Sequence, residues 1–501
     1  MQFPSMVNIL KLILSVFSLI TVSYCNCPDS FQISPHKLLL ISFDGFRWDY
    51  LQRKNTNLPH FENLISSGVK AKWIEDIFVT QTFPNHYTIV TGLYEESHGI
   101  VANKFYDPVL NKTFKMSSTE DEFWGGEPIW VTNQLHNHQS GVYFWVGSEA
   151  KEKNIHPTIY EPYDASVPWT DRVDTVVNWL VNGNEDGEIN LALLYFNQPD
   201  HDGHKYGPES DEVTETIKRC DNITGYLVEQ LKLYNLFSDI NIIITSDHGM
   251  TELSQNRTVN IDKYVDQNDV FKIIDYGTGA GVWPSSNEAD AIDKLYKSLK
   301  GIGNHVQVYK KDEIPDRYHY SNNVRIPPIL LVPDDGWWIN YNSSLQLNGS
   351  HGYDNDLLDM HPFFISHGPS FKQNYTSEPF SSVHIYSLMC HLLGFPPAPN
   401  NGSLQNIRHI LNNDSINIPG ICNGSEYVTK YILVIALCSV LMLIIFTVTL
   451  YKKVRSCKRD KELAVMLDDR VFSAAEDDLY LGYPDVELSP LVKSGPLKIY
   501  K

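Results

Sequence analysis

The chain has 501 residues, which is enough for one large domain or two of ordinary size, and its apolar and charged fractions (42% and 20%) are those of a folded protein. Its formal net charge of −20 argues against polymeric DNA or RNA as a partner, because no basic surface would release counterions. A small anionic substrate is not excluded, since bound metal ions dominate the local charge of such a site.

The amino-terminal residues 1–25 have the features of a secretory signal peptide. Lys11 precedes an apolar run over residues 12–22, and the small residues Ser23 and Cys25 suit cleavage before Asn26. An amino-terminal anchor helix is the alternative, but the run is short for a bilayer span. We therefore predict export of the chain.

Short apolar and β-branched runs indicate buried strands, and amphipathic stretches between them indicate helices. Strands are predicted at residues 37–43, 142–146, 191–196 and 240–245, and helices at residues 172–180 and 211–233. Strands that alternate with helices indicate an α/β fold, with a central, mostly parallel sheet covered by helices on both faces. We assign residues 26–400 to this domain, and we expect irregular or short-stranded structure at residues 310–341.

Metal-binding residue types follow three of the predicted strands. Asp44 comes directly after the first strand, Asp200 a few residues after the third, and Asp247 with His248 after the fourth. Because active sites of such sheets form at the carboxyl ends of the strands, we expect these side chains to lie together. That placement follows from the pattern of strands and helices alone.

Seven residues form a candidate ligand set for two divalent metal ions. His204 lies one helical turn after Asp200, and His351 lies in a Gly-Ser-His-Gly string. Each string alone is common in proteins without a metal. Together, carboxylates balance charge, imidazoles favour zinc and one hydroxyl serves as nucleophile. The predicted ligands are Asp44, Thr82, Asp200, His204, Asp247, His248 and His351.

Thr82 is the candidate nucleophile of this set. Pro84 suits the first turn of a helix through Tyr87 and Val90, which places Thr82 at the helix amino terminus, where free amides and the helix dipole favour phosphate. The alternative is a threonine that only caps the helix. The other six ligand-type residues favour the catalytic interpretation.

The region after residue 400 predicts a membrane anchor. Residues 401–430 are polar and typical of a glycosylated stalk, and residues 431–451 are apolar, uncharged and long enough to span a bilayer. The basic residues Lys452, Lys453, Arg455, Lys458, Arg459 and Lys461 follow at once. Positive residues stay cytoplasmic, so residues 452–501 form the cytoplasmic tail of a single-pass type I protein whose folded domain is extracellular.

Glycosylation sequons support this orientation, because all of them precede the apolar run. Their acceptors are Asn111, Asn222, Asn256, Asn342, Asn348, Asn374, Asn401, Asn413 and Asn423. Cys27, Cys220, Cys390 and Cys422 would face an oxidising lumen, where four cysteines allow three pairings, and the sequence does not choose among them. Cys457, just inside the membrane, is either palmitoylated or an unmodified thiol.

With these strings, the chain resembles the ectonucleotide pyrophosphatase/phosphodiesterase family of the alkaline phosphatase superfamily, from about residue 37 to about residue 411. The matching strings are Ser-Phe-Asp-Gly-Phe-Arg at 42–47, Thr-Phe-Pro-Asn-His-Tyr at 82–87, Thr-Gly-Leu-Tyr at 91–94, Ser-His-Gly-Ile at 97–100, Pro-Asp to Gly-Pro at 199–208, and Ser-Asp-His-Gly-Met at 246–250. The chain lacks the cysteine-rich modules and the nuclease-like domain of the longer members, so it resembles the short type I membrane members.

The resemblance implies an alkaline-phosphatase-like fold with two zinc ions per catalytic domain. Asp200, His204 and His351 would bind one zinc ion, and Asp44, Thr82, Asp247 and His248 the other. Asn103 would donate to a phosphate oxygen, and Phe83 and Tyr163 would stack on a nucleobase. The string around Asp200 departs from the family pattern at His201 and Asp202, and the sequon at Asn348 lies close to His351.

By the same resemblance, we expect an extracellular phosphodiesterase that cleaves NAD, diadenosine polyphosphates and nucleoside di- or triphosphates to nucleoside 5′-monophosphates. Thr82 would form a nucleotidyl-threonine intermediate that water hydrolyses. A choline-phospholipid phosphodiesterase is one alternative, but those relatives tend to use serine as nucleophile. A non-enzymatic cell-surface protein is another, but a decayed relative should lack a metal ligand, and none is missing here.

Overall fold

The computed structural model describes residues 36–54, 56–185, 187–274, 276–342, 344–413, 439 and 443–462. The chain divides into two compact units, Met1–Ile421 and Cys422–Lys501. The signal peptide and most of the span predicted at 431–451 lie outside the described residues, and the described part of the second unit includes a helix over residues 443–462. Within the described ranges, no helix is both long and apolar enough to cross a membrane.

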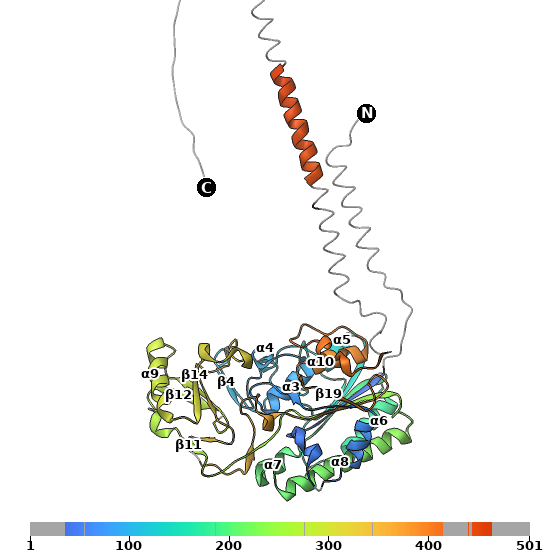
Figure 1. Ribbon diagram of the computed structural model, residues 1–501, viewed down its shortest axis with the longest axis vertical. Helices are drawn as coiled ribbons and strands as arrows, with labels where there is room; N and C mark the ends of the chain where they lie inside the picture. Colours follow the sequence, from blue (N-terminus) through green and yellow to red (C-terminus); the bar gives the residue numbers. More distant parts are fainter. Residues whose placement is uncertain are drawn as a thin grey trace, which may run out of the picture. The chain divides into compact units, whose positions relative to one another are not determined.

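An eight-stranded sheet lies at the centre of the first unit (Figure 1). In spatial order its strands are β19 (Tyr375–Ser377), β2 (Val69–Ala71), β18 (Phe364–His367), β9 (Ile240–Thr245), β1 (Lys37–Phe43), β8 (Ile189–Phe196), β6 (Gln139–Tyr143) and β7 (Ile159–Glu161). Neighbouring strands are parallel, except that β18 runs antiparallel to β9 and β2. The predicted α/β class is confirmed, with a sheet that is mixed.

Helices cover both faces of this sheet (Figure 1). Along β1, Leu38 and Leu40 pack into one apolar core, and Leu39 and Ile41 pack into the other. The first core includes residues of α3 (Thr82–Thr91), α5 (Ile129–Leu135) and α10 (His384–Leu393), and the second includes residues of α2 (Pro59–Ser66), α6 (Trp169–Asn182) and α8 (Asp211–Leu233). Burial on both faces explains why residues 38–41 of this strand are all apolar.

The predicted bounds of β1, β9 and α8 agree with the structure, whereas β6 differs from its prediction. β6 ends at Tyr143 and not at Val146, because Phe144 adopts a positive φ of 68°, which no strand residue has. The backbone turns there, and the apolar residues after Tyr143 are buried in a loop.

A smaller antiparallel sheet with its own core was not predicted. Its strands, in spatial order, are β12 (Val270–Ile274), β13 (Ala280–Pro284), β15 (Ile329–Pro333) and β14 (Val306–Lys310), and α9 (Ala289–Leu299) packs against it. The predicted short-stranded segment 310–341 contributes β15 and β16 (Trp338–Asn340).

The remaining elements are short connections. They are the pairs β3 (Ile74–Glu75) with β20 (Phe380–Ser381), β4 (Phe105–Asp107) with β5 (Lys112–Phe114), β10 (Thr251–Glu252) with β17 (Gly349–Ser350) and β11 (Thr258–Asn260) with β16, the helices α4 (Glu95–His98), α7 (Asp200–Tyr206) and α11 (Leu404–Ile407), and the 3-10 turns η1 (Trp48–Gln52), η2 (Asp121–Phe123), η3 (Asp262–Tyr264), η4 (Lys300–Ile302), η5 (Lys311–Glu313), η6 (Asp316–Tyr318), η7 (Leu358–Met360) and η8 (Arg408–Ile410).

Two sequence expectations need correction. The predicted stalk at 401–430 begins too early, because Ile407, Ile410 and Leu411 are buried in the first apolar core. Cys220 and Cys390 are both free and fully buried, so none of the three complete pairings forms. Cys220 and Cys390 pack on opposite faces of the central sheet, which keeps them from pairing with each other. The described sequon asparagines, which are all except Asn423, are exposed.

Candidate active site

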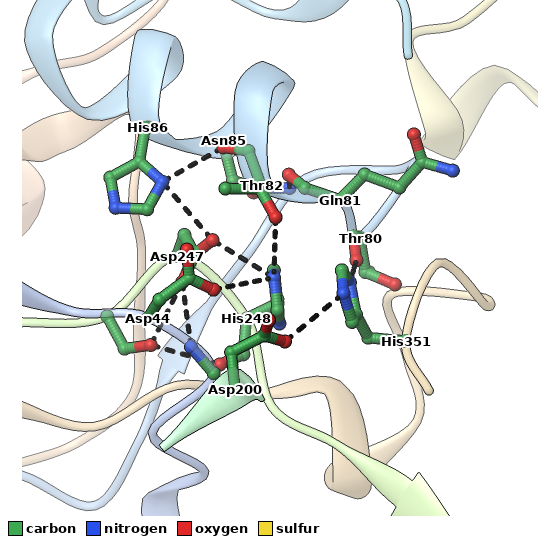
Figure 2. A network of polar contacts seen from close by, with 12 residues as sticks. Asp44, Thr80, Gln81, Thr82, Asn85, His86, Asp200, Asp247, His248 and His351 are labelled. Carbon is green, nitrogen blue, oxygen red and sulfur yellow. Dashed lines mark hydrogen bonds and ion pairs between the residues drawn. The ribbon is translucent and has the colours of Figure 1, made fainter. Parts of the chain in front are cut away.

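The central strands bring three carboxylates to one edge of the sheet. Phe43 of β1 lies beside Phe196 of β8, and Ser42 lies beside Thr245 of β9, so these strands end next to one another. Asp44, Asp200 and Asp247 follow them and meet at this edge (Figure 2). The structure therefore places these side chains where the strand pattern predicted.

His351 reaches the site through a local strand pair that the sequence did not indicate. β10 begins shortly after His248, and its Thr251 pairs with Ser350 of β17, which immediately precedes His351. The His248 and His351 rings consequently stack, with centroids 3.4 Å apart and planes inclined by 10°. At Gly349, a Cβ atom would lie 2.5 Å from the Gly203 carbonyl oxygen, so only glycine allows β17 to approach α7 this closely.

The six acidic and histidine residues form two groups of possible metal ligands. In the first, Asp200 Oδ1 lies 3.3 Å from His204 Nε2 and 3.4 Å from His351 Nε2. In the second, His248 Nε2 lies 3.4 Å from Asp44 Oδ1 and 3.0 Å from Asp247 Oδ2. Within each group the ligand atoms all lie within 4.8 Å of one another, which suits coordination of a single ion.

The histidine rings are oriented by backbone carbonyl groups. Nδ1 of His204 donates to Gly349 O at 2.9 Å, Nδ1 of His248 to Gly249 O at 2.8 Å, and Nδ1 of His351 to Thr80 O at 2.8 Å. A carbonyl oxygen only accepts hydrogen bonds, so each Nδ1 carries a proton. In the neutral rings, Nε2 therefore presents its lone pair to the carboxylates, as a metal ligand requires.

Three buried carboxylate oxygens lack a hydrogen-bond partner anywhere in the described chain. They are Asp44 Oδ1, Asp200 Oδ1 and Asp247 Oδ2, the atoms that face the histidine Nε2 atoms. By contrast, Asp44 Oδ2 accepts from the Tyr195 hydroxyl at 2.5 Å, and Asp247 Oδ1 accepts from Gly45 N at 3.1 Å. A buried carboxylate without a partner is costly. The donor set and its unsatisfied atoms therefore fit two divalent cations.

Electrostatic repulsion among the buried carboxylates also indicates a cation site. Burial, followed by the Asp247 and Asp200 carboxylates, raises the pKa of Asp44 well above its ordinary value. Burial opposes protonation of His248, but the adjoining Asp247 carboxylate raises the pKa of His248 to about 10. Burial and the neighbouring histidines lower the pKa of His351. A cation in each group would compensate the repulsion among the carboxylates.

Thr82 lies beside the second ligand group. It is the first residue of α3, after the N-cap residue Gln81, and its Oγ1 lies 3.3 Å from His248 Nε2. The capping position is thus occupied by Gln81, and the Thr82 hydroxyl points toward the ligand atoms (Figure 2). In the first turn of α3, Phe83 N donates to Asn103 Oδ1, Asn85 N donates to Gln81 O and Pro84 has no N–H, so among the described contacts the Thr82 amide is the one left for an anion.

Of the residues predicted to bind substrate, Phe83 and Asn103 adjoin Thr82, and Tyr163 packs against Tyr195, whose hydroxyl donates to Asp44. Asn103 Oδ1 accepts from Phe83 N at 2.8 Å, so only its Nδ2 group remains to donate to a ligand. The Phe83 ring packs against Phe114 and Trp124, with centroid distances of 6.0 and 6.3 Å. Tyr163 is 48% exposed. Among the described ring contacts, none joins Phe83 directly to Tyr163.

Two residues that the sequence analysis did not single out hold the site together. The Tyr195 hydroxyl donates to Asp44, as described above. Buried His86 has Nδ1 2.9 Å from Thr82 O and 3.2 Å from Asp247 Oδ2, and Nε2 2.8 Å from Ser42 Oγ. The only sequence signal was the position of His86 in the same string as Thr82, since these partners are far apart in the chain.

The departures from the family pattern lie beside the ligands. Asp202 Oδ2 accepts from Thr216 Oγ1 at 2.5 Å and so connects α7 to α8, and His201 is exposed. Asn348 is exposed, and its backbone nitrogen donates to His204 O at 2.9 Å. A glycan at Asn348 would therefore start beside the first ligand group.

Comparisons with known proteins agree with this geometry. Residues 38–354 match the family described as type I phosphodiesterase / nucleotide pyrophosphatase. The chain is 45% identical over 399 residues to human bis(5'-adenosyl)-triphosphatase ENPP4, covering 78% of this chain and 85% of that protein. It is 41% identical over 438 residues to human ectonucleotide pyrophosphatase/phosphodiesterase family member 5, covering 84% and 90%.

A solved structure of murine family member 5, an inactive threonine-to-alanine variant in complex with AMP, is similar with a TM-score of 0.72 and 43% identity, covering 75% of this chain and 100% of that chain. The family match, the identities and the shared fold agree with one another. The chain therefore belongs to the type I phosphodiesterase / nucleotide pyrophosphatase family of hydrolases, within the alkaline phosphatase superfamily.

Proposed function

We propose that this protein is a cell-surface, zinc-dependent enzyme that cleaves phosphodiester or pyrophosphate bonds of nucleotides and releases nucleoside 5′-monophosphates. One observation carries the proposal: three buried carboxylate oxygens that have no hydrogen-bond partner among the described residues face histidine Nε2 atoms, beside the Thr82 hydroxyl. Carboxylates and imidazoles at these positions suit two zinc ions. Asp200, His204 and His351 would hold one ion, and Asp44, Asp247, His248 and Thr82 the other.

The bound ions would lower the pKa of the Thr82 hydroxyl and neutralise charge on the phosphate. Thr82 Oγ1 then attacks phosphorus in line, the bond to the leaving oxygen breaks, and a nucleotidyl-threonine ester forms. Water hydrolyses this ester, which regenerates Thr82 and releases the monophosphate. Asn103 donates from Nδ2 to a non-bridging oxygen, and the positive amino-terminal end of the α3 dipole stabilises the same charge.

Nucleotides are the substrate class that the relatives and the site favour. Human ENPP4 is named a bis(5'-adenosyl)-triphosphatase, and the murine structure holds AMP. Phe83 and the exposed Tyr163 provide aromatic surfaces for a nucleobase. We therefore propose NAD, diadenosine polyphosphates and nucleoside di- or triphosphates as substrates.

The extracellular location and the membrane anchor are proposals from the sequence. The signal peptide, the one-sided sequons and the basic residues after the apolar run support a type I protein, and the described sequon asparagines are exposed, as glycosylation requires. Protease added to intact cells should release a glycosylated, active fragment and leave a tail epitope protected. Protection of the catalytic domain would refute this orientation.

Thr82→Ala tests the mechanism, with Thr82→Ser as the matched control that keeps a hydroxyl. We expect Thr82→Ala to fold and to lose turnover on a panel of nucleotides, because no nucleophile remains. Thr82→Ser should retain measurable turnover. Near-wild-type activity of Thr82→Ala would refute the covalent route. Turnover of glycerophosphocholine but not of nucleotides would refute the substrate class.

A further inference from the structure

Arg172 of α6 is a fully buried cation without a carboxylate partner in the part of the chain that the structure describes. Among the described residues, the acceptors of its guanidinium group are all backbone carbonyls. Nε and Nη2 bond Val167 O at 3.1 and 3.0 Å, Nη2 bonds Ala165 O at 3.3 Å, and Nη1 bonds Tyr195 O at 3.3 Å. Burial of a charge without a counter-ion opposes folding. We therefore expect the buried Arg172 side chain to have a role that compensates for this cost.

The carbonyls belong to the two segments that position Tyr163. Ala165 and Val167 lie between β7 and α6, in the segment that also carries Tyr163. Tyr195 lies on β8, and its ring contacts the Tyr163 ring with centroids 6.0 Å apart. Arg172 therefore connects the segment that carries Tyr163 to strand β8 of the central sheet. The ring of Tyr195, on the same strand, also contacts the Tyr163 ring.

The guanidinium group also contacts Phe144, the second aromatic ring that packs against Tyr163. Its Cζ lies 5.0 Å from the Phe144 ring centroid and 5.7 Å from that of Phe196, within cation–π range. Phe144 in turn meets the Tyr163 ring edge-on, with centroids 5.4 Å apart. Phe144 is a bulky residue at a φ of 68°, a conformation that persists only where surrounding contacts hold it.

We propose that Arg172 is the positioning residue that sets Tyr163 for nucleobase stacking, so that it governs the capture of nucleotides more than bond cleavage. This inference rests on the proposed nucleotide-cleaving function. Tyr163 is half-exposed, and its neighbours Phe144 and Tyr195 are both held by Arg172. The planar guanidinium group of arginine can bond several carbonyls while it stacks on aromatic rings, and a lysine ammonium group cannot do both. No described contact of Arg172 reaches Thr82 or the metal-ligand groups.

The test compares two esters with the same nitrophenolate leaving group in the full-length protein. One is the p-nitrophenyl ester of a nucleoside 5′-monophosphate, and the other is p-nitrophenyl methylphosphonate, which has no base. We expect Arg172→Lys and Arg172→Met to raise KM for the nucleotide ester by about tenfold, since stacking a base is worth that order of affinity. The loss on the methylphosphonate should be much smaller. Arg219→Met is the matched control, because Arg219 is exposed and stacks over Trp169 at 4.8 Å.

A double-mutant cycle separates positioning from general damage. In a Tyr163→Ala background, Arg172→Lys should cause little further loss on the nucleotide ester, because its effect passes through Tyr163. Additive losses, or equal losses on both esters in folded variants, would overturn the proposal. If the Arg172 variants do not fold, Phe144→Leu should show the same substrate split, and equal losses would again overturn it. A wild-type protein that cleaves only the methylphosphonate would instead refute the nucleotide function itself.

Discussion

Replacing Tyr195 by phenylalanine should weaken metal binding while the fold is kept. The Tyr195 hydroxyl donates to Asp44 Oδ2 at 2.5 Å, and both residues are buried. Phenylalanine retains the ring, which contacts the His86 and Tyr163 rings at 5.2 and 6.0 Å. The change therefore removes one hydrogen bond, leaves Asp44 Oδ2 without a donor, and frees the carboxylate that presents Oδ1 to the second ligand group.

The magnitude follows from the charge of the acceptor. A hydrogen bond to a charged group contributes about 1.5–3 kcal/mol, and about 1.4 kcal/mol changes a dissociation constant tenfold. We expect the zinc dissociation constant to rise by roughly 10- to 100-fold. The hydroxyl also lowers the pKa of Asp44 against the burial and the neighbouring carboxylates that raise it. Its loss should increase proton competition, so the deficit should grow toward acidic pH.

The assay is a zinc competition titration against a chromogenic chelator, at mildly acidic and mildly alkaline pH. Tyr386→Phe is the matched control, because Tyr386 is also buried and its hydroxyl pairs with Thr132 Oγ1 at 2.7 Å and accepts from Ala398 N at 3.0 Å. The control should lose some thermal stability and keep its zinc affinity. A Tyr195→Phe protein that binds zinc as tightly as the wild type would refute the metal assignment of Asp44.

Three further predictions concern metal choice, pH and thiols. Chelation should abolish activity, and zinc should restore it better than magnesium, because imidazole ligands favour zinc; full reactivation by magnesium alone would contradict this. Burial raises the pKa of Asp76 from 3.8 to about 7, although His361 opposes the shift, so the folded state retains a proton that the unfolded state releases and stability should fall as pH rises through that interval. Asp76→Asn should flatten that part of the stability curve, and parallel curves would exclude the effect. Cys220 and Cys390 should resist thiol reagents until the protein unfolds, because burial raises the pKa of both thiols; rapid native labelling would disprove this.

Local sequence determined the elements whose signals lie within their own residues. β1 contains the apolar run 38–41 and β9 the apolar run 242–244 because both faces of each strand are buried, so their positions could be predicted directly. α8 has an amphipathic pattern and a serine cap, with Ser210 Oγ accepting from Val213 N at 3.2 Å. Since parallel strands end at one edge, the sequence also indicated that the residues after these strands would meet.

Tertiary structure alone decided how those residues are held. Tyr195 and Asp44 are 151 positions apart, and His351 and Thr80 are 271 apart, so no local pattern relates them. The reversed direction of β18 and the separation of Cys220 from Cys390 by the sheet likewise depend on packing. The physical reason is that hydrogen-bond geometry and burial are set by groups from distant segments, whereas periodicity in a sequence reports only which face of its own element a residue occupies.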